Sequence, residues 1–167
     1  MSTEAARWVK ELQLIKHVEG GYYREVYRSG LTVDKSHLPE GFHGNRNICT
    51  GIYFLLENNR FSAFHRIASD ELWHFYSGNT LSIYEIEKDG KLKEHKLGSN
   101  PENGESFQTV IKAGNWFSSR VSNGEGYALA GCTVSPGFDF EDFELAERKS
   151  LIEQFPQHEE LIKALTR

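Results

Sequence analysis

A predicted β-hairpin at residues 61–78 limits what this chain can fold into more than any other stretch. Its first strand, Phe61–Ile67, interleaves polar side chains among apolar ones, and a short polar turn follows. Its second strand, Glu71–Tyr76, is mostly aromatic. His65 and Glu71 lie at the two inner ends of the hairpin. We therefore expect an imidazole and a carboxylate side by side on one face.

The rest of the chain predicts an all-β protein with short flanking helices. Further strands, separated by turns rich in Gly and Asn, are expected at 22–28, 48–56, 80–86, 91–97, 107–111, 116–121 and 127–134. This spacing is typical of a sandwich or barrel. An amphipathic helix is expected at 3–12, and residues 29–46 are interpreted as a mobile surface loop. Helices at 145–155 and 157–165 should cover one sheet.

The length of the chain indicates the number of domains, and its charge limits the classes of partner. A chain of 167 residues without a linker predicts a single domain, 1–167. The net charge of −5, with no run of Lys or Arg, argues against nucleic acid or an anionic membrane as a partner. The sequence shows no signal peptide and no apolar run that could span a bilayer, so we expect a cytoplasmic protein. Cys49 and Cys132 are expected to be buried free thiols, although one disulfide is possible.

The spacing in the hairpin resembles the first motif of the cupin superfamily. That motif is His, any residue, His, three or four residues, Glu, six residues, Gly. His65, Glu71 and Gly78 fill three of its positions, whereas Ile67 replaces the second histidine. The second cupin motif resembles the segment at 112–117 more weakly. There the glycine matches, but the histidine position holds Phe117.

Longer phrases at 19–24 and 131–140 are similar to one particular cupin family of unknown function. The similarity runs from about Leu14 to the C-terminus. Members of that family resemble sugar-nucleotide epimerases. The resemblance implies a cupin double-stranded β-helix, which is a jelly-roll barrel, with a short N-terminal helix and C-terminal helices. It also implies a homodimer.

The substitutions at the motif positions predict a protein without metal and without a cofactor. A catalytic cupin metal is usually held by three imidazoles and one carboxylate. Ile67 and Phe117 cannot donate an electron pair, and His65 with Glu71 alone would hold a divalent ion weakly. His74 lies three residues after Glu71, so a regular strand turns it to the opposite face.

His65 and Glu71 are the candidate catalytic residues. Cupin-fold epimerases use a His base and a Tyr acid on a keto sugar, and the resemblance places His65 at the base position. A carboxylate that orients a buried imidazole makes it a competent general base. The acid could be Tyr76, Tyr84 or Tyr127, and the sequence does not choose among them. The alternative is a structural His–Glu pair that only pins the turn.

The candidate ligand-binding residues are aromatic, with one arginine. Arg24, in an aromatic strand, is the better candidate for binding an anion, because Arg66 alternates away from His65. The others are Trp73, Phe75, Tyr84, Tyr127 and Phe117, which are expected to line the barrel, although such rings can equally be core. The five histidines at 17, 37, 43, 95 and 158 are interpreted as ordinary surface residues.

Three functions follow from these residues and the resemblance. The leading one is a cupin that binds a small polar ligand, as an isomerase or epimerase of a carbohydrate or nucleotide-linked sugar. The second is a metal-dependent cupin enzyme, which bound metal would favour. The third is a non-catalytic binding protein, which an intact pocket without turnover would favour. The first rests on fold analogy.

Overall fold

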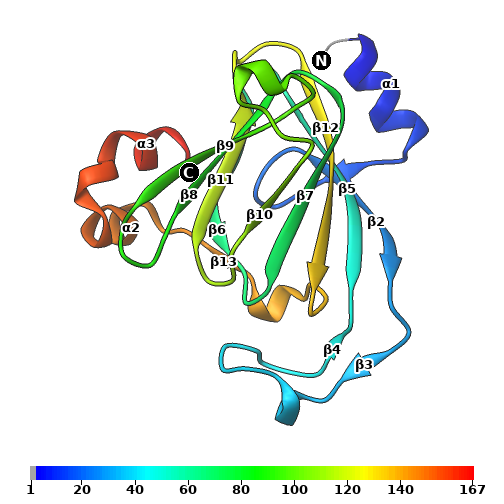
Figure 1. The fold of residues 1–167 in the computed structure, drawn as a ribbon, viewed down its shortest axis with the longest axis vertical. Helices are drawn as coiled ribbons and strands as arrows, with labels where there is room; N and C mark the ends of the chain where they lie inside the picture. The colour runs from blue at the N-terminus through cyan, green and yellow to red at the C-terminus, as the bar shows by residue number, and fades with distance from the viewer. Residues whose placement is uncertain (1–2) are drawn as a thin grey trace.

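Two antiparallel β-sheets face each other in the computed structural model, which describes residues 3–167 (Figure 1). The first sheet has the strand order β1-β2-β5-β12-β7-β10 and the second the order β13-β6-β11-β8-β9. The first comprises β1 (Ile15–Lys16), β2 (Tyr22–Arg28), β5 (Thr50–Glu57), β12 (Tyr127–Ser135), β7 (Asp70–Gly78) and β10 (Gln108–Ile111). The second comprises β13 (Glu144–Leu145), β6 (Phe61–Arg66), β11 (Trp116–Val121), β8 (Leu81–Ile86) and β9 (Leu92–Leu97). The all-β prediction is confirmed.

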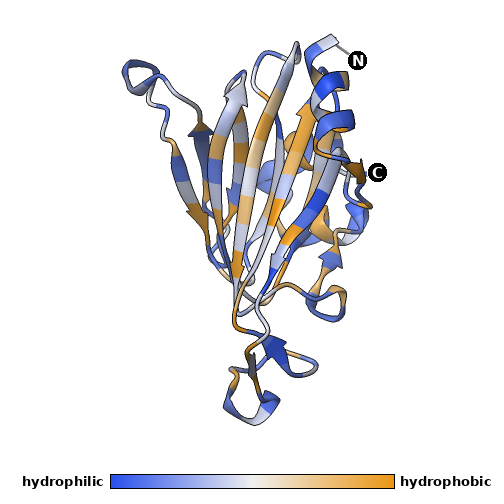
Figure 2. Ribbon diagram, turned by 90° about the vertical axis from the view of Figure 1, so that its right-hand side faces the viewer, coloured by the Kyte–Doolittle hydropathy of each residue, from blue (hydrophilic) through white to orange (hydrophobic). Residues whose placement is uncertain are grey.

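The helices lie at the two ends of the chain, as predicted. Helix α1 (Thr3–Glu11) packs on the outer side of the first sheet, and Ala5 and Leu14 contribute to the apolar cluster there (Figure 2). Helices α2 (Arg148–Gln154) and α3 (Glu159–Ala164) pack on the second sheet. Short 3-10 helices are η1 (Lys35–His37), η2 (Pro101–Asn103), η3 (Phe140–Asp142) and η4 (Pro156–His158). No helix within residues 3–167 is long and apolar enough to cross a membrane.

The predicted hairpin at 61–78 is two strands of different sheets. Strand β6 pairs with β11 and β13, and β7 pairs with β12 and β10. The turn between them therefore crosses from one sheet to the other, and the prediction of a paired hairpin is wrong. Apolar and aromatic side chains from both sheets, among them Trp73 and Phe75 of β7, fill the space between the sheets. Inner-face residues of β6 and β7 consequently face each other across the barrel.

Strand β2 departs from regular alternation. The register with β5 shifts between Glu25 and Tyr27, which marks a β-bulge. Beyond the bulge the alternation is displaced by one residue, so Arg28 shares the inner face with Tyr23 and Glu25. Regular alternation would have placed Arg28 on the face of Arg24.

Residues 29–46 form an arm instead of an unstructured loop. Strand β3 (Thr32–Val33) pairs with β4 (Arg46–Asn47), and the arm extends away from the barrel (Figure 1). The buried Arg46 guanidinium ties the arm to η3 through Asp142, which Arg46 Nη2 contacts at 2.7 Å. This ion pair fixes the residues that follow β12 near the end of the barrel.

Candidate functional site

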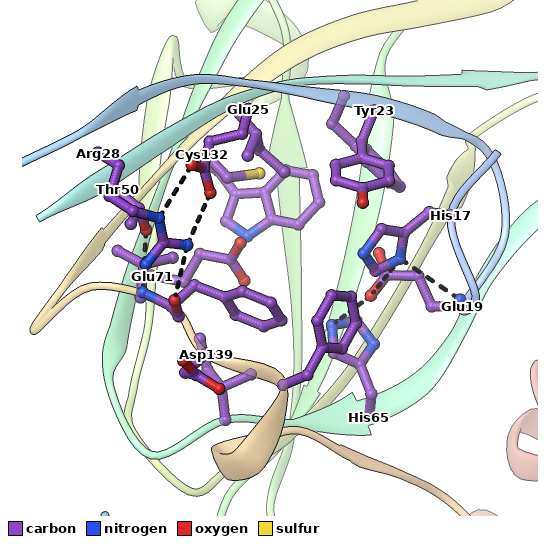
Figure 3. A pocket seen from close by; sticks show the side chains of 17 residues that line it. His17, Glu19, Tyr23, Glu25, Arg28, Thr50, His65, Glu71, Cys132 and Asp139 are labelled. Atoms are coloured by element: carbon purple, nitrogen blue, oxygen red, sulfur yellow. Dashed lines mark hydrogen bonds and ion pairs between the residues drawn. The ribbon is translucent and has the colours of Figure 1, made fainter. Parts of the chain in front are cut away.

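A cavity of about 180 Å³ lies between the sheets at the end near the arm (Figure 3). Its wall combines side chains of β2, β5, β6, β7 and β12 with the segments at 17–19 and 138–140. Four carboxyl groups and two imidazoles face it, among aromatic rings. These polar groups are held by inner-face positions of strands, by the tight loop at 17–19 and, for Asp139, by the start of η3. The site is therefore built on rigid elements.

His65 lies on β6 and is 3% exposed. Its Nδ1 lies 2.7 Å from the carbonyl oxygen of Ala63, which can only accept, so Nδ1 carries a proton. Its Nε2 lies 3.0 Å from Oε2 of Glu19. Burial lowers the pKa of His65, although the bond to Ala63 and the charge of Glu71 oppose that shift. The ring therefore favours its neutral form, with Nε2 as an acceptor.

Glu19 completes this pair from the loop between β1 and β2. Burial raises the pKa of Glu19, against the effects of His17 and of the hydroxyl of Ser62, which donates to Oε1 at 2.9 Å. Both pKa shifts favour a neutral pair, in which the carboxylic acid of Glu19 donates to Nε2 of His65. His65 is thus held at both ring nitrogens.

His17, like Glu19, is a site residue that the sequence did not indicate. It was interpreted as a surface residue, but its side chain is only 7% exposed. Its ring packs edge-on against Tyr23 at 4.4 Å between centroids. Nδ1 accepts from the backbone N–H of Glu19 at 3.4 Å, which leaves the ring proton on Nε2. Burial lowers the pKa of His17, so the ring is a neutral donor. No described residue hydrogen bonds to that Nε2.

Two glycines bring the loop with His17 and Glu19 to the cavity. Gly20 and Gly21 have φ values of +126° and +72°, and a Cβ at Gly20 would lie 2.1 Å from the carbonyl oxygen of Phe61. This close approach lets the carbonyl of Glu19 accept from the N–H of Ala63 at 2.8 Å. The Gly-Gly pair was the signal that could have placed His17 inside.

Glu71 faces the cavity from the opposite sheet and is 8% exposed. Burial raises the pKa of Glu71 to about 7. The indole N–H of Trp73 and the thiol of Cys132 lower the pKa weakly, but Nε1 of Trp73 makes no hydrogen bond of good geometry. His65 and Glu71 share one cavity, as predicted, although the bonded partner of His65 is Glu19.

The other predicted ligand-binding residues are spread over the molecule. Trp73 lines the cavity, and Phe117 supports it from behind by packing on His65 at 4.0 Å between ring centroids. Phe75 packs on the same core but borders a separate polar pocket beside Asn79 and Glu105. Phe75 lies further along β7 than Glu71, towards the other end of the barrel.

The structure does not bring Arg24, Tyr84 or Tyr127 to the cavity. Arg24 lies on the outer face of β2 and donates to the carbonyl oxygen of Leu12 at 3.2 Å. Tyr84 faces the tail helices, where its hydroxyl accepts from Arg120 at 3.2 Å. Tyr127 packs beneath α1, and its hydroxyl accepts from the Trp8 indole. All three side chains lie on the outer face of their sheet.

Tyr23 is the tyrosine that faces the cavity. Tyr76, the remaining tyrosine considered from the sequence, is 51% exposed on the outer face of β7. At the mouth, Arg28 pairs with Glu25 through two bonds of 2.9 and 2.7 Å, close to Asp139. Arg28 thus takes the place at the site that the sequence had given to Arg24.

These residues do not fit the metal site of a catalytic cupin. Ile67 and Phe117, at two of its imidazole positions, have hydrocarbon side chains, and both are buried. No three His, Cys, Asp or Glu side chains within residues 3–167 are placed to hold a metal ion. Both imidazoles at the site are also committed to other bonds through at least one nitrogen.

Comparisons with known proteins agree with the fold. The family profile Cupin_5, described as "Cupin superfamily (DUF985)", matches residues 6–146. The uncharacterized protein YML079W of Saccharomyces cerevisiae is 34% identical over 143 residues, which cover 80% of this chain and 71% of the yeast protein. Protein SO0799 of Shewanella oneidensis is 40% identical in its crystal structure, with a TM-score of 0.88 over 98% of this chain and 97% of that one. A hypothetical protein from Leishmania major is 37% identical, with a TM-score of 0.87 over 97% and 98% of the two chains. The predicted jelly-roll and the resemblance to a cupin family of unknown function are confirmed.

Proposed function

This chain belongs to the Cupin_5 family (DUF985) of the cupin superfamily, and from that premise we propose that it binds a small polar molecule in the cavity and transfers a proton on it. The reaction class is isomerisation or epimerisation of a carbohydrate. One observation supports this proposal most. Glu71 faces the cavity, and burial raises its pKa to about 7, which is the value that suits a general acid–base at neutral pH.

Glu71 is a better candidate for the base than His65. Its carboxyl faces the cavity without a strong partner, whereas His65 is bonded at both ring nitrogens, to Ala63 and Glu19. We therefore assign proton transfer to Glu71. His65 and Glu19 act as positioning residues, because their neutral pair fixes the wall opposite the carboxyl.

The proton transfer can be written with these groups alone. The carboxylate of Glu71 takes the proton from the hydroxyl-bearing carbon next to a carbonyl. The electron pair of that C–H bond forms the C=C bond of an enediolate, and the π pair of the carbonyl moves to its oxygen. The neutral Nε2–H of His17 or the hydroxyl of Tyr23 donates to this oxygen and stabilises its developing charge. Protonated Glu71 then returns the proton to the former carbonyl carbon, while the proton of the adjacent hydroxyl moves to the oxyanion, which completes an aldose–ketose isomerisation.

The cavity favours a free carbohydrate over a nucleotide-linked one. Its volume equals the liquid volume of about six waters at about 30 Å³ each, which is below the range of drug-sized pockets. Arg28 is the only Lys or Arg among the described lining residues, and Glu25 already neutralises it. A pyrophosphate would therefore meet no available cation.

Deuterium exchange tests the reaction. Purified protein is incubated with unphosphorylated aldoses and ketoses in D₂O, and NMR follows deuterium at the carbon next to the carbonyl. Glu71→Gln should slow the exchange by at least about 100-fold. Glu125→Gln, at an exposed position, should leave it unchanged. Native mass spectrometry of protein purified without added ligand identifies any bound molecule. A bound molecule that never exchanges a C–H proton would reject the reaction and leave a binding protein.

A further inference from the structure

Acidic side chains outnumber basic ones around the cavity. Glu19, Glu25, Glu71 and Asp139 face it, against the single guanidinium of Arg28. The N–H groups of Arg28 donate to protein acceptors. Two bonds go to the carboxylate of Glu25, one of 2.8 Å goes to the side chain of Asn47, and one of 3.1 Å goes to the carbonyl oxygen of Phe138. The lining residues thus offer an incoming anion no free positive charge.

Glu71 is the interior carboxyl that lacks a cationic partner. The titratable groups that face it are His65 from β6, Glu19 from the β1–β2 loop and Cys132 from β12. His65 and Glu19 form a neutral pair, and the thiol of Cys132 stays protonated because burial raises its pKa well above the usual value. None of these groups supplies a permanent positive charge.

The walls suit an ammonium group that carries hydroxyls. Aromatic side chains of Tyr23, Phe54, Trp73, Phe138 and Phe140 surround the cavity, and aromatic faces attract organic cations. Two donors also face it without a well-formed bond in the described structure: Nε1 of Trp73, which is buried, and Nε2 of His17. A buried donor needs an acceptor, which a ligand hydroxyl oxygen provides to Trp73, and a second hydroxyl oxygen can accept from His17.

We infer that the ligand of the cavity is a small amino sugar or amino polyol, bound through its ammonium group to the carboxylate of Glu71. This inference rests on the proposed function, because it names the substrate class of the same site. The ammonium replaces the missing counter-charge of Glu71, and the hydroxyls meet His17 and Trp73. Phosphorylated and carboxylated sugars are excluded by the same charges.

Three matched six-carbon polyols test the inference: sorbitol, glucamine and sorbitol phosphate. They differ in one terminal group, which is a hydroxyl, an ammonium or a phosphate at pH 7. Titration calorimetry should show glucamine binding at least about tenfold more tightly than sorbitol, and sorbitol phosphate more weakly than either. Glu71→Gln is close to isosteric with the protonated acid and should remove the advantage of glucamine over sorbitol.

Proton linkage gives a second readout on the unmodified protein. An ammonium bound to Glu71 favours the ionised carboxylate, so glucamine binding near pH 7 should release up to about half a proton. Repeating the titration in buffers with different ionisation enthalpies measures this number and its sign. Proton uptake, equal affinity for the three polyols, or tighter binding of the phosphate would overturn the inference.

These experiments distinguish a failure of the amine inference from a failure of the proposed function. If none of the three polyols binds at millimolar concentration, the amine inference is rejected. A neutral sugar that still exchanges deuterium in a Glu71-dependent manner would leave the proposed function intact. Binding of glucamine without deuterium exchange on any ligand would support the ligand class and reject the reaction.

Discussion

The Nε2 atom of His65 lies 3.0 Å from Oε2 of Glu19, a residue 46 positions earlier in the chain. Both side chains are buried, and their pKa shifts, lowered for the imidazole and raised for the carboxyl, have the same physical cause, which is loss of water. Nε2 of His65 and the carboxyl of Glu19 therefore share a single proton. The pair joins the loop with His17 to β6, so it shapes the cavity and also stabilises the fold.

Removing the imidazole should therefore cost stability. His65→Ala leaves the buried carboxyl of Glu19 without its partner, and we expect the free energy of unfolding to fall by about 1–3 kcal/mol. Urea denaturation followed by fluorescence measures this change. His37→Ala, at an exposed position, should stay within about 0.5 kcal/mol of the parent.

Glu19→Gln distinguishes the neutral pair from an ion pair. The amide of Gln can donate to Nε2 of His65 and accept from Ser62, so the neutral pair predicts a smaller loss than that of His65→Ala. A larger loss would show that a charge had been removed.

Unchanged ligand binding in a strongly destabilised His65→Ala variant would reject any role of His65 at the site.

The protein should hold no tightly bound transition metal. Ile67 and Phe117 stand where a catalytic cupin has imidazoles, and Ile67 lines the cavity beside His65 and Glu71. Elemental analysis after dialysis against a weak chelator should find far less than one equivalent of Fe, Mn, Ni or Zn per chain. Ile67→His is the matched comparison and should retain more metal. Near one equivalent in the unaltered protein would contradict the prediction.

A homodimer is expected, with the open edge of β2 at its interface. Strand β1 pairs with β2 only at Tyr22 and Tyr23, so the edge beyond them meets no other strand within residues 3–167. Val26 and Tyr27 there are 52% and 55% exposed. Free edges of this kind tend to pair with another chain.

Light scattering at micromolar concentration tests the dimer and should give twice the 19.1 kDa chain mass. Tyr27→Lys places a charge at the interface and should shift the mass towards the monomer. Leu92→Lys makes the same change on β9, the edge of the second sheet, and should leave the dimer intact. A clean monomer in the unaltered protein would refute the assembly.

Local spacing predicted the parts of this fold that depend on neighbouring residues. Alternation around His65 and Glu71 placed both side chains inside the barrel, and the expected strands are present. Spacing could not show that β6 and β7 belong to different sheets, because a turn that joins paired strands and one that crosses between sheets can use similar residues.

The rest of the site depends on contacts between distant segments. Glu19 and His17 reach the cavity because Gly20 and Gly21 fold their loop against β6, which alternation along one strand cannot reveal. The bulge in β2 brings Arg28 to the inner face in the same way, since one additional residue reverses the facing of every later side chain, whereas Arg24 precedes the bulge and stays on the outer face. Bulges and close backbone approaches are properties of the assembled sheets.

Glu71 should make stability depend on pH in a direction opposite to that of a paired surface carboxylate. Folding raises the pKa of Glu71 from 4.5 to about 7, so the folded chain binds this proton more tightly than the unfolded chain does. Its stabilising contribution is complete below about pH 4.5 and is lost as the pH rises through about 7, by at most about 3.4 kcal/mol. Glu71→Gln cannot titrate, and the other buried groups remain in both proteins, so the difference between the two unfolding free energies isolates Glu71. Urea denaturation between pH 5 and pH 8 should show the variant gaining on the parent as the pH rises. Parallel curves would mean that Glu71 is ionised throughout this range, and that it cannot be a general base tuned to neutral pH.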